Sequence, residues 1–520
     1  MKYRFPALAL FYLLSSARVL LGQAAPAPNP TPVAERSHVE RFSSPRMRDE
    51  RAETEATKKL TANPNDTEAL RTRAYARMGL QRYPEALEDL RRALAVEPNN
   101  ATVEANYGYV LWKLGRRAEA VTQEREAVKL DEKNFTAQYQ LGRFLMFSGG
   151  EQNLREAATH LRRALEIDPR QTEIRFDLLA VYRTLGDTAQ AIAQLNLLQD
   201  SRPTDPRVVY VDALLASDRG DLNAAIMGFR QALRQDPTLY GAKQDLGLAL
   251  IKLKKWGEAE DVFADLAREQ SDSVEIAYFD ALSLFNTGRS ADAEREARRA
   301  LRLDAGAAAA HTLLGIILAA RGGHDAEASD ALTQAVALDA SSFDARFYLG
   351  RVQYAMQDYA NAVKSLRAAV SLDQRNAEAR FFLGTALESA GNSEAALTEY
   401  QELTRIDPNS AMGQVGLGAL LVKQGKIDDA ISALKRAISL DAHSFEAHWA
   451  LGRALILAER FSDAIEPLKV AVVLIPDRAD AHYQLGLALK RAGRVEEAAR
   501  EFAEVERINR EFRTRTAPRQ

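Results

Sequence analysis

Alanine recurs at one fixed position through most of this 520-residue chain. The series reads Ala86, Ala120, Ala157, Ala191, Ala225, Ala259, Ala293, Ala328, Ala362, Ala396, Ala430, Ala464 and Ala498. Ten of its twelve intervals are identical, and the two from Ala120 to Ala157 and from Ala293 to Ala328 are slightly longer. A fixed period of about 34 residues indicates a stacked array in which each unit is one supersecondary element.

Two further positions of each unit are small. A glycine or alanine lies twelve residues before the recurring alanine in ten units, and fifteen and thirteen residues before it in the two units that follow the longer intervals. Leu179 takes its place in the remaining unit, and another alanine often lies seven residues after the recurring alanine. Small residues at fixed points let helices approach closely. Between the first two positions a glycine such as Gly115 or Gly288 often supplies a helix end. The pattern predicts a helix–turn–helix unit, repeated thirteen times.

With these positions the chain resembles the tetratricopeptide repeat family, whose pattern has Leu-Gly in the first helix, alanine opening the second, and a closing proline. Residues Phe445 to Pro476 carry the cleanest match, FEAHWALGRALILAERFSDAIEPLKVAVVLIP. The resemblance covers roughly residues 64–510. It implies an all-α fold, a right-handed α-solenoid or superhelix of tandem helix–turn–helix repeats, and it implies no particular activity.

We expect five segments along the chain. They are a signal peptide at 1–24, a Pro-rich disordered spacer at 25–45, a capping helix at 46–66, the array at 67–512 and a tail at 513–520. The thirteen repeats should start near residues 67, 101, 135, 172, 206, 240, 274, 308, 343, 377, 411, 445 and 479. We expect the two irregular intervals to lengthen the turns near 149–153 and 322–325.

The start of the chain, from Met1 to Ala24, has the order of a secretory signal. Lys2 and Arg4 precede an apolar run, and small residues follow, with cleavage possible after Ala17 or Ala24. Arg18 interrupts the apolar stretch, so a stable transmembrane anchor is not expected. The sequence predicts export to the periplasm or secretion, and a cytoplasmic protein if the leader is not a signal. The absence of cysteine suits an oxidising compartment.

Aromatic and arginine side chains recur on the first helices. In the family that the chain resembles, these helices line the concave groove, and position five of the repeat points into it. We therefore predict a ligand-binding stripe in the groove, with Phe347 and Arg351 as its central pair. Its residues are Tyr139, Arg143, Phe176, Tyr210, Tyr278, Phe347, Arg351, Phe381, Trp449, Arg453 and Tyr483. For each aromatic, packing against the adjacent helix is the competing interpretation.

Other kinds of site are not indicated. The chain has no cysteine, no zinc-protease motif, no phosphate loop and no nucleophile elbow, so we expect no enzyme activity and no cofactor. His448 and His482 share one position of their repeats without a third recurring ligand, which favours packing over metal binding. Charged residues make up 27% with a net charge of −3, which argues against nucleic acid.

Two functions fit these observations. The first is an exported, non-catalytic scaffold that binds extended peptide segments or partner proteins in its concave groove. The alternative is a scaffold in cell-envelope polysaccharide or cell-wall assembly, whose groove aromatics stack on the sugars of an envelope glycan. The sequence does not name the ligand, the pathway or the oligomeric state.

Overall fold

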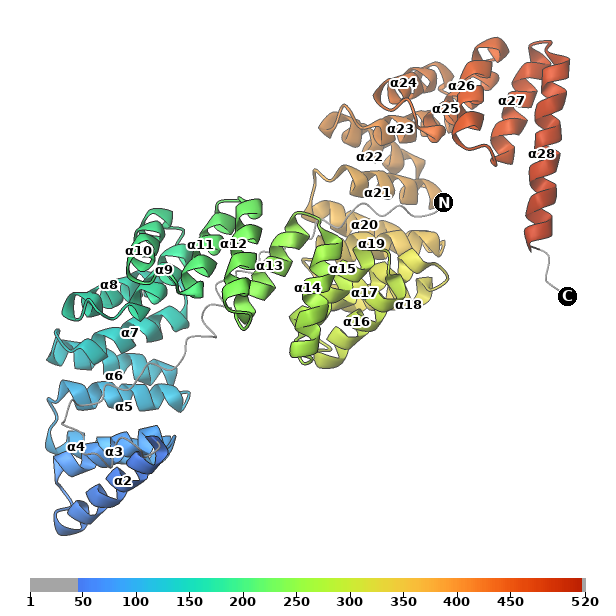
Figure 1. The fold of residues 1–520 in the computed structure, drawn as a ribbon. Coiled ribbons are helices and arrows are strands. Elements are labelled where there is room, and N and C mark those ends of the chain that lie inside the picture. The colour runs from blue at the N-terminus through green and yellow to red at the C-terminus, as the bar shows by residue number, and fades with distance from the viewer. Residues whose placement is uncertain (1–44, 517–520) are drawn as a thin grey trace. The chain divides into compact units, whose positions relative to one another are not determined.

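The computed structural model describes residues 45–516, and the predicted signal peptide and most of the spacer lie outside them. Within residues 45–516 the chain forms 27 helices and no strand. The described residues divide into two bodies, 45–262 and 263–516, with the boundary inside the helix at Trp256–Glu269. Each body is a stack of antiparallel helix pairs (Figure 1). The expected all-α solenoid is confirmed.

Thirteen helix pairs follow a first helix, α2 (Pro45–Ala62), and we number them as repeats 1 to 13. The first helices of the pairs are α3 Thr67–Gly79, α5 Ala101–Lys113, α7 Phe135–Ser148, α9 Glu173–Thr184, α11 Pro206–Asp218, α13 Tyr240–Lys252, α15 Val274–Asn286, α17 Ala308–Arg321, α19 Phe343–Ala355, α21 Ala377–Ser389, α23 Ala411–Lys423, α25 Phe445–Leu457 and α27 Ala479–Arg491.

The second helices complete the pairs. They are α4 Tyr83–Val96, α6 Arg117–Leu130, α8 Glu151–Ile167, α10 Thr188–Ser201, α12 Leu222–Gln235, α14 Trp256–Glu269, α16 Ser290–Leu303, α18 Asp325–Leu338, α20 Tyr359–Leu372, α22 Ser393–Ile406, α24 Ile427–Leu440, α26 Phe461–Leu474 and α28 Val495–Thr516.

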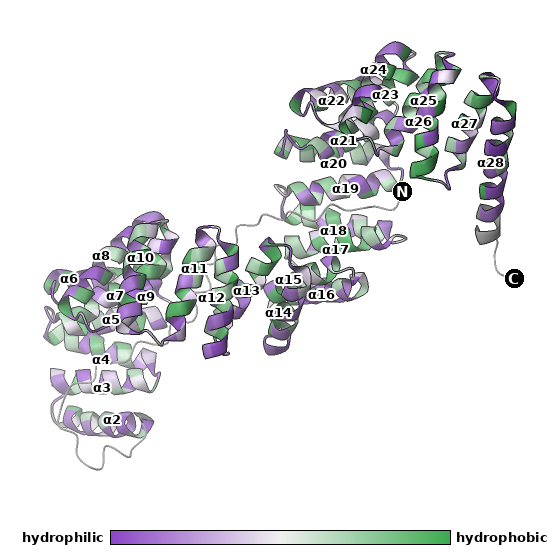
Figure 2. Ribbon diagram, turned by 45° about the horizontal axis from the view of Figure 1, so that its top comes forward, coloured by the Kyte–Doolittle hydropathy of each residue, from purple (hydrophilic) through white to green (hydrophobic). Residues whose placement is uncertain are grey.

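Hydrophobic and hydrophilic residues are interleaved along the helices (Figure 2). The thirteen recurring alanines are all buried, and twelve of them are fully inaccessible. A short polar side chain caps many of the first helices. Asn100, Ser342 and Ser444, for example, each accept a hydrogen bond from the backbone N–H three residues later. Such caps satisfy amide groups that a helix start leaves without partners.

The turn inside each pair is fixed by the fold more than by its residue type. Every pair has a residue with positive φ two places after the first helix ends, and in nine pairs it is glycine, as at Gly115. In four others the same place holds Gln81, Lys254, Gln357 or Glu459, with φ between 57° and 63°. Glycine is the favoured residue for this conformation, and here the flanking helices impose it on other residues too.

The expectation of longer turns in repeats 3 and 8 is wrong. In repeat 3 the three extra residues extend α8 to 17 residues, and the turn before it is only Gly149 and Gly150. In repeat 8 the extra residue extends α17 to 14 residues. A helix can absorb these residues because an added turn keeps its backbone hydrogen-bonded.

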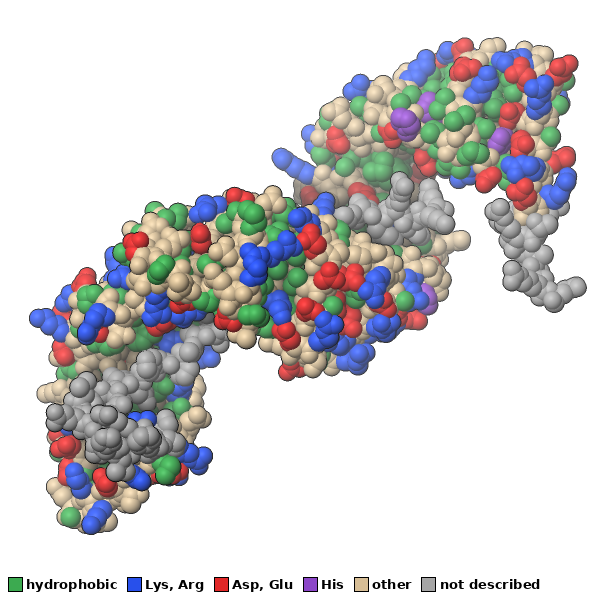
Figure 3. Space-filling view, viewed as in Figure 1, with side chains coloured by type: hydrophobic (Ala, Val, Ile, Leu, Met, Phe, Trp, Pro, Cys, Tyr) green, Lys and Arg blue, Asp and Glu red, His purple; other side chains and the backbone are tan. Residues whose placement is uncertain are grey.

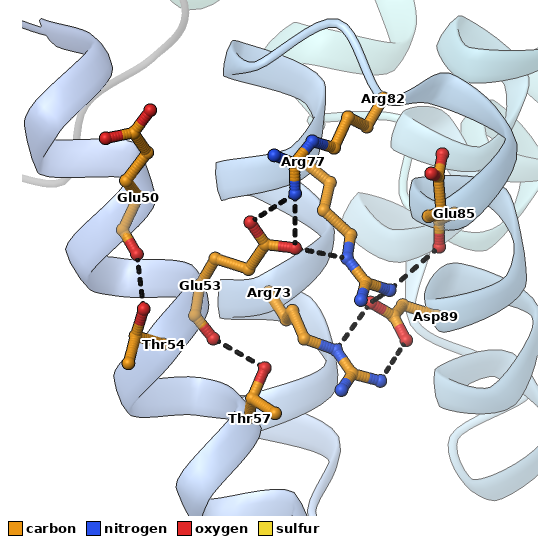
Figure 4. Close-up of polar contacts among 9 residues, drawn as sticks. All are labelled: Glu50, Glu53, Thr54, Thr57, Arg73, Arg77, Arg82, Glu85 and Asp89. Carbon is orange, nitrogen blue, oxygen red and sulfur yellow. Dashed lines mark hydrogen bonds and ion pairs between the residues drawn. The ribbon is translucent and has the colours of Figure 1, made fainter.

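Helix α2 is fixed to repeat 1 by charged side chains (Figure 4). Arg77 of α3 donates to Glu53 of α2 at 3.0 Å and to Asp89 of α4 at 2.7 Å, so one guanidinium joins three helices. Arg73 adds two hydrogen bonds to Asp89, which is almost fully buried. Because Asp89 is bound by two arginines, its burial is compensated by charge-assisted hydrogen bonds.

Candidate functional site

The first helices of successive repeats contact one another directly, across the second helix that separates them in sequence. This holds within the first body from α5 to α9 and from α11 to α13, and within the second from α15 to α27. All eleven predicted site residues lie on these helices. We call the exposed side of the first helices the first-helix face.

The structure places the predicted residues at different depths. Arg453 and Tyr483 are exposed, with Tyr483 at 49%. The half-buried members are Tyr139, Arg143, Phe176, Tyr278, Phe381 and Trp449. Tyr210, Phe347 and Arg351 are buried, at 7%, 4% and 7% exposure. The expectation of a continuous exposed stripe is therefore wrong for these three residues.

The two buried aromatics pack on other aromatic rings, one in the next repeat and one in its own repeat. The Phe347 ring lies 5.8 Å from Phe382 of the next first helix in a T-shaped contact. The Tyr210 ring lies 6.0 Å from Phe229 of its own repeat. Such pairs stabilise a core beyond their buried area. The packing interpretation thus applies to Tyr210 and Phe347.

Three arginines occupy the same position, nine, of repeats 3, 9 and 12, each stacked on the aromatic four residues earlier. Arg143 lies over Tyr139 and 3.8 Å from Asp177 of repeat 4. Arg351 lies over Phe347 and 3.5 Å from Glu378 of repeat 10. In both cases the next repeat supplies a carboxylate to the stacked guanidinium.

Arg453 differs from its two counterparts. Its guanidinium lies 4.7 Å from the centre of the Trp449 ring, yet no carboxylate of the described residues pairs with it. The carboxylate in register with Glu378 is Asp480, and Asp480 instead accepts hydrogen bonds from Arg478 at 3.0 and 3.1 Å. Arg478 in turn lies over the Phe445 ring. The stacked guanidinium of repeat 12 therefore stays open to solvent.

Trp449, Arg453 and Tyr483 form the cluster that we call the Trp449 cluster. Trp449 packs against buried Phe445, Ala471 and Ala481, which fixes its ring between α25 and α27. Its indole N–H has no acceptor among the described residues. Tyr483 follows on α27, with its ring 6.0 Å from Phe502. Because the indole N–H is buried, what the cluster offers to a ligand is a cation and aromatic surface on rigid helices.

Two tyrosine–aspartate pairs on the first helices were not anticipated from the sequence. The Tyr210 hydroxyl donates to Asp245 of the next repeat at 2.7 Å, and both side chains are buried. Tyr139 is also paired with Asp177 of repeat 4, but both of these side chains are only half-buried. Burial raises the pKa of each aspartate to about 6, although the tyrosine hydrogen bonds and nearby arginines oppose the rise. The sequence feature that could have indicated these pairs is an aspartate roughly one repeat length after a tyrosine at position five of a repeat.

The two histidines that share one position serve the fold. His448 Nε2 lies 3.1 Å from the Ala442 carbonyl oxygen, and His482 Nε2 lies 2.9 Å from that of Pro476. Each ring thus ties its helix to the preceding loop. No group of three or more potential metal ligands comes together in residues 45–516.

Family models described as tetratricopeptide repeat match residues 71–135, 150–217, 280–345, 323–369, 347–411, 415–478 and 468–511, which is more than half of the chain. The chain belongs to the tetratricopeptide repeat family. The resemblance stated from the sequence is thereby confirmed.

Several solved structures are similar to this tetratricopeptide repeat protein. The hetero-tetramer Cut9–Hcn1 of the APC/C is 15% identical with a TM-score of 0.45, over 85% of this chain and 94% of that one. MamA is 23% identical with a TM-score of 0.29, and the match covers 32% of this chain and 97% of MamA. YrrB, described as having an unusual peptide-binding site, is 22% identical with a TM-score of 0.30. The match covers 36% of this chain and 95% of YrrB. No curated protein matches the chain.

The surface carries both signs of charge. Acidic and basic side chains are interspersed on the face that Figure 3 shows, in keeping with a net charge of −3. Among the helices of residues 45–516, none combines the length and apolarity needed to cross a bilayer.

The Tyr210–Asp245 pair makes local stability depend on pH. The folded chain holds the proton of Asp245 up to pH about 6, whereas an unfolded aspartate loses it near 3.8. Stability must therefore fall as pH rises from about 4 to 6. We expect a loss of about 2 kcal/mol in the opening free energy of residues 206–252, measured by hydrogen exchange corrected for the chemical rate.

Asp245→Asn should remove this loss, because the asparagine oxygen still accepts from Tyr210 and carries no charge. Asp212→Asn, on the exposed side of α11, is the matched control and should leave the dependence unchanged. Equal pH dependence in wild type and Asp245→Asn would contradict this assignment.

Proposed function

We propose that this tetratricopeptide repeat protein is an exported, non-catalytic scaffold that binds an extended peptide segment on its first-helix face, with the Trp449 cluster as its anchoring point for a carboxylate. The observation that carries the proposal is the open guanidinium of Arg453. Two arginines in the same register already hold a carboxylate in a stacked arrangement. The third presents the same arrangement to solvent.

The chemistry of the cluster favours an acidic peptide. A planar guanidinium can hold a carboxylate through two parallel hydrogen bonds while its face stays stacked on the indole. Exposed Tyr483 and half-buried Leu487, on the adjacent helix α27, add surface for an apolar side chain of the same ligand. Lys490 and Arg491, which follow at the end of α27, add positive charge. An Asp, a Glu or a free C-terminus next to an apolar side chain would complement these groups.

Export rests on the order of residues in the leader, where a positive start, an apolar run and small residues follow one another. Binding partners in the cell envelope or outside the cell are the corresponding proposal.

The site is tested with fluorescent dodecapeptides that differ only in their number of acidic residues and in whether the C-terminus is free or amidated. Anisotropy should show tighter binding with each added carboxylate. Arg453→Gln should weaken binding of the acidic peptides about 10-fold and reduce its salt dependence, because the lost interaction is between charges.

Arg436→Gln, the same change on the exposed side of second helix α24, is the control and should bind as wild type does. If neutral and acidic peptides bind equally, or if Arg453→Gln has no effect, the cluster is not a carboxylate site. Binding of envelope oligosaccharides that tolerates Arg453→Gln but is lost in Tyr483→Ala would favour the glycan scaffold.

Export has its own test. The mature protein should begin near Arg18 or Ala25 and fractionate with periplasmic or secreted material, as shown by N-terminal sequencing of the purified chain. Protein that retains Met1 and is recovered from the cytosol would contradict export.

A further inference from the structure

Glu124 of α6 occupies a core position that is apolar or aromatic in every other repeat. The position lies four residues after the recurring alanine. Its other occupants are Leu90, Leu161, Leu195, Phe229, Phe263, Ala297, Leu332, Leu366, Tyr400, Leu434, Leu468 and Phe502. Glu124 has 0% exposure, as its leucine counterparts Leu90 and Leu468 do. Repeat 2 thus buries a carboxyl group where the fold elsewhere buries hydrocarbon.

Only one of the two carboxyl oxygens of Glu124 has a hydrogen-bond partner among the described residues. A Cβ added at Gly108 of α5 would lie 2.8 Å from Glu124 Oε1, so the side chain is pressed against the first helix. In the orientation that suits its neighbours, the Gln140 amide of α7 donates to Glu124 Oε1 at 2.6 Å and to the Ala105 carbonyl oxygen at 3.1 Å. Glu124 Oε2 is buried and has no partner among the described residues. A buried polar atom left in this way is costly in free energy.

Gly108, Glu124 and Gln140 form a polar layer between α5, α6 and α7. On one side of the layer the buried core is Ala105, Ala127 and Ala137, and on the other it is Leu111, Ala120 and Phe144. The layer therefore lies between two small apolar clusters at the junction of repeats 2 and 3. In a solenoid each repeat is stabilised only by its neighbours, so a weak junction affects the chain locally.

Repeat 12 provides an internal comparison. There Gly452 and Gln484 stand where repeats 2 and 3 have Gly108 and Gln140, and Leu468 takes the place of Glu124. Leu468 is fully buried in one continuous cluster that extends from Ile431 to Ala498. The two junctions thus have the same glycine and glutamine. They differ in the core residue between them, which is Glu124 in one and Leu468 in the other.

The charges around Glu124 do not offset its burial. The helices packed against α6 are α5 and α7, and Arg125 of α6 also pairs with Glu156 of α8. From α5 the half-buried carboxylate of Glu104 repels it. On α7, Tyr139 and Arg143 engage Asp177 of repeat 4, and Gln140 is neutral. Desolvation, with the Glu104 charge second, raises the pKa of Glu124 well above its ordinary value.

We propose that Glu124 makes the junction between repeats 2 and 3 a proton-controlled hinge, closed while its carboxyl group is protonated and opened more readily once that group is ionised. The folded junction retains the proton at pH values where an opened one has lost it. Its stability is therefore present at low pH, falls as pH rises from the ordinary carboxyl range to the raised value, and is level above it. Within that window the opening equilibrium should rise up to 10-fold per pH unit.

The full-length chain is studied by hydrogen exchange between pH 4 and 8, with each rate corrected for the chemical exchange rate. Peptides from residues 101–148 should lose protection as pH rises, whereas peptides from residues 445–478 should keep it. Trp112 gives a second readout, because its ring stacks on Phe144 across the hinge. The ring centres are 4.3 Å apart and the angle between the ring planes is 3°. With Trp256 and Trp449 replaced by Phe, its emission should change over the same pH range.

Glu124→Gln should remove the share of the pH dependence that Glu124 contributes, since its amide cannot ionise in this range, and leave the share that Glu104 and the Tyr139–Asp177 pair contribute. Glu124→Leu, which recreates the core of repeat 12, should raise protection at every pH. Glu119→Gln, on the same helix in an exposed pair with Arg116, is the matched control and should behave as wild type. The proposal is overturned if residues 101–148 show no pH dependence, or if Glu124→Gln or Glu124→Leu retains the wild-type dependence.

Discussion

The close approach of the two helices at the glycine of repeats such as 9 and 12 is the constraint on which the rest of the structure depends. A Cβ placed on Gly452 would lie 2.3 Å from Cγ of Leu468, and one on Gly350 would lie 2.5 Å from Cγ of Leu366. These distances are shorter than any real carbon contact, so only a residue without a side chain fits there. The leucine of the second helix fills the space above the glycine. Because the helices are this close, first helices of successive repeats also reach one another.

In a repeat array of this kind, we expect function at the positions where one repeat differs from the others. A leucine at the core position gives a rigid repeat, and a glutamate there gives a junction whose stability follows its proton. A stacked arginine closed by the next repeat's carboxylate is part of the fold. The same arginine is open for a ligand where that carboxylate pairs with Arg478 instead. The proposed peptide site and the proposed hinge thus each rest on one or two side chains.

The repeat positions could be predicted from the sequence because they depend on contacts within one repeat length. Sequence alone placed Ala430 and Gly452 correctly at packed positions, and both lie in the tight contacts expected of them. Exposure on the first-helix face could not be predicted in the same way. Phe347 is buried because Phe382 of the next repeat lies against it, and Tyr483 is exposed at the last first helix. The residue that decides exposure is therefore outside the motif.

The incorrect turn prediction and the two residues that the sequence analysis missed also depend on contacts outside a single repeat motif. Extra residues suggested longer turns, but α8 and α17 absorbed them because an extended helix satisfies more backbone groups than a loop does. Glu124 was overlooked because its spacing from Ala120 acquires meaning only when all thirteen repeats are aligned at the core position. Asp245 was overlooked because its partner, Tyr210, lies in the preceding repeat.

A double-mutant cycle at Gly452 and Leu468 tests the packing account most directly, with protection of residues 445–478 as the readout. Gly452→Ala alone should destabilise repeat 12 by about 1–3 kcal/mol, because its methyl group would overlap Leu468. In a Leu468→Ala background the overlap is gone, so Gly452→Ala should stabilise the helix by about 1 kcal/mol through its higher helix propensity. A change of sign between the two backgrounds is the predicted result. The same destabilisation in both would show that the close contact does not hold the repeats together.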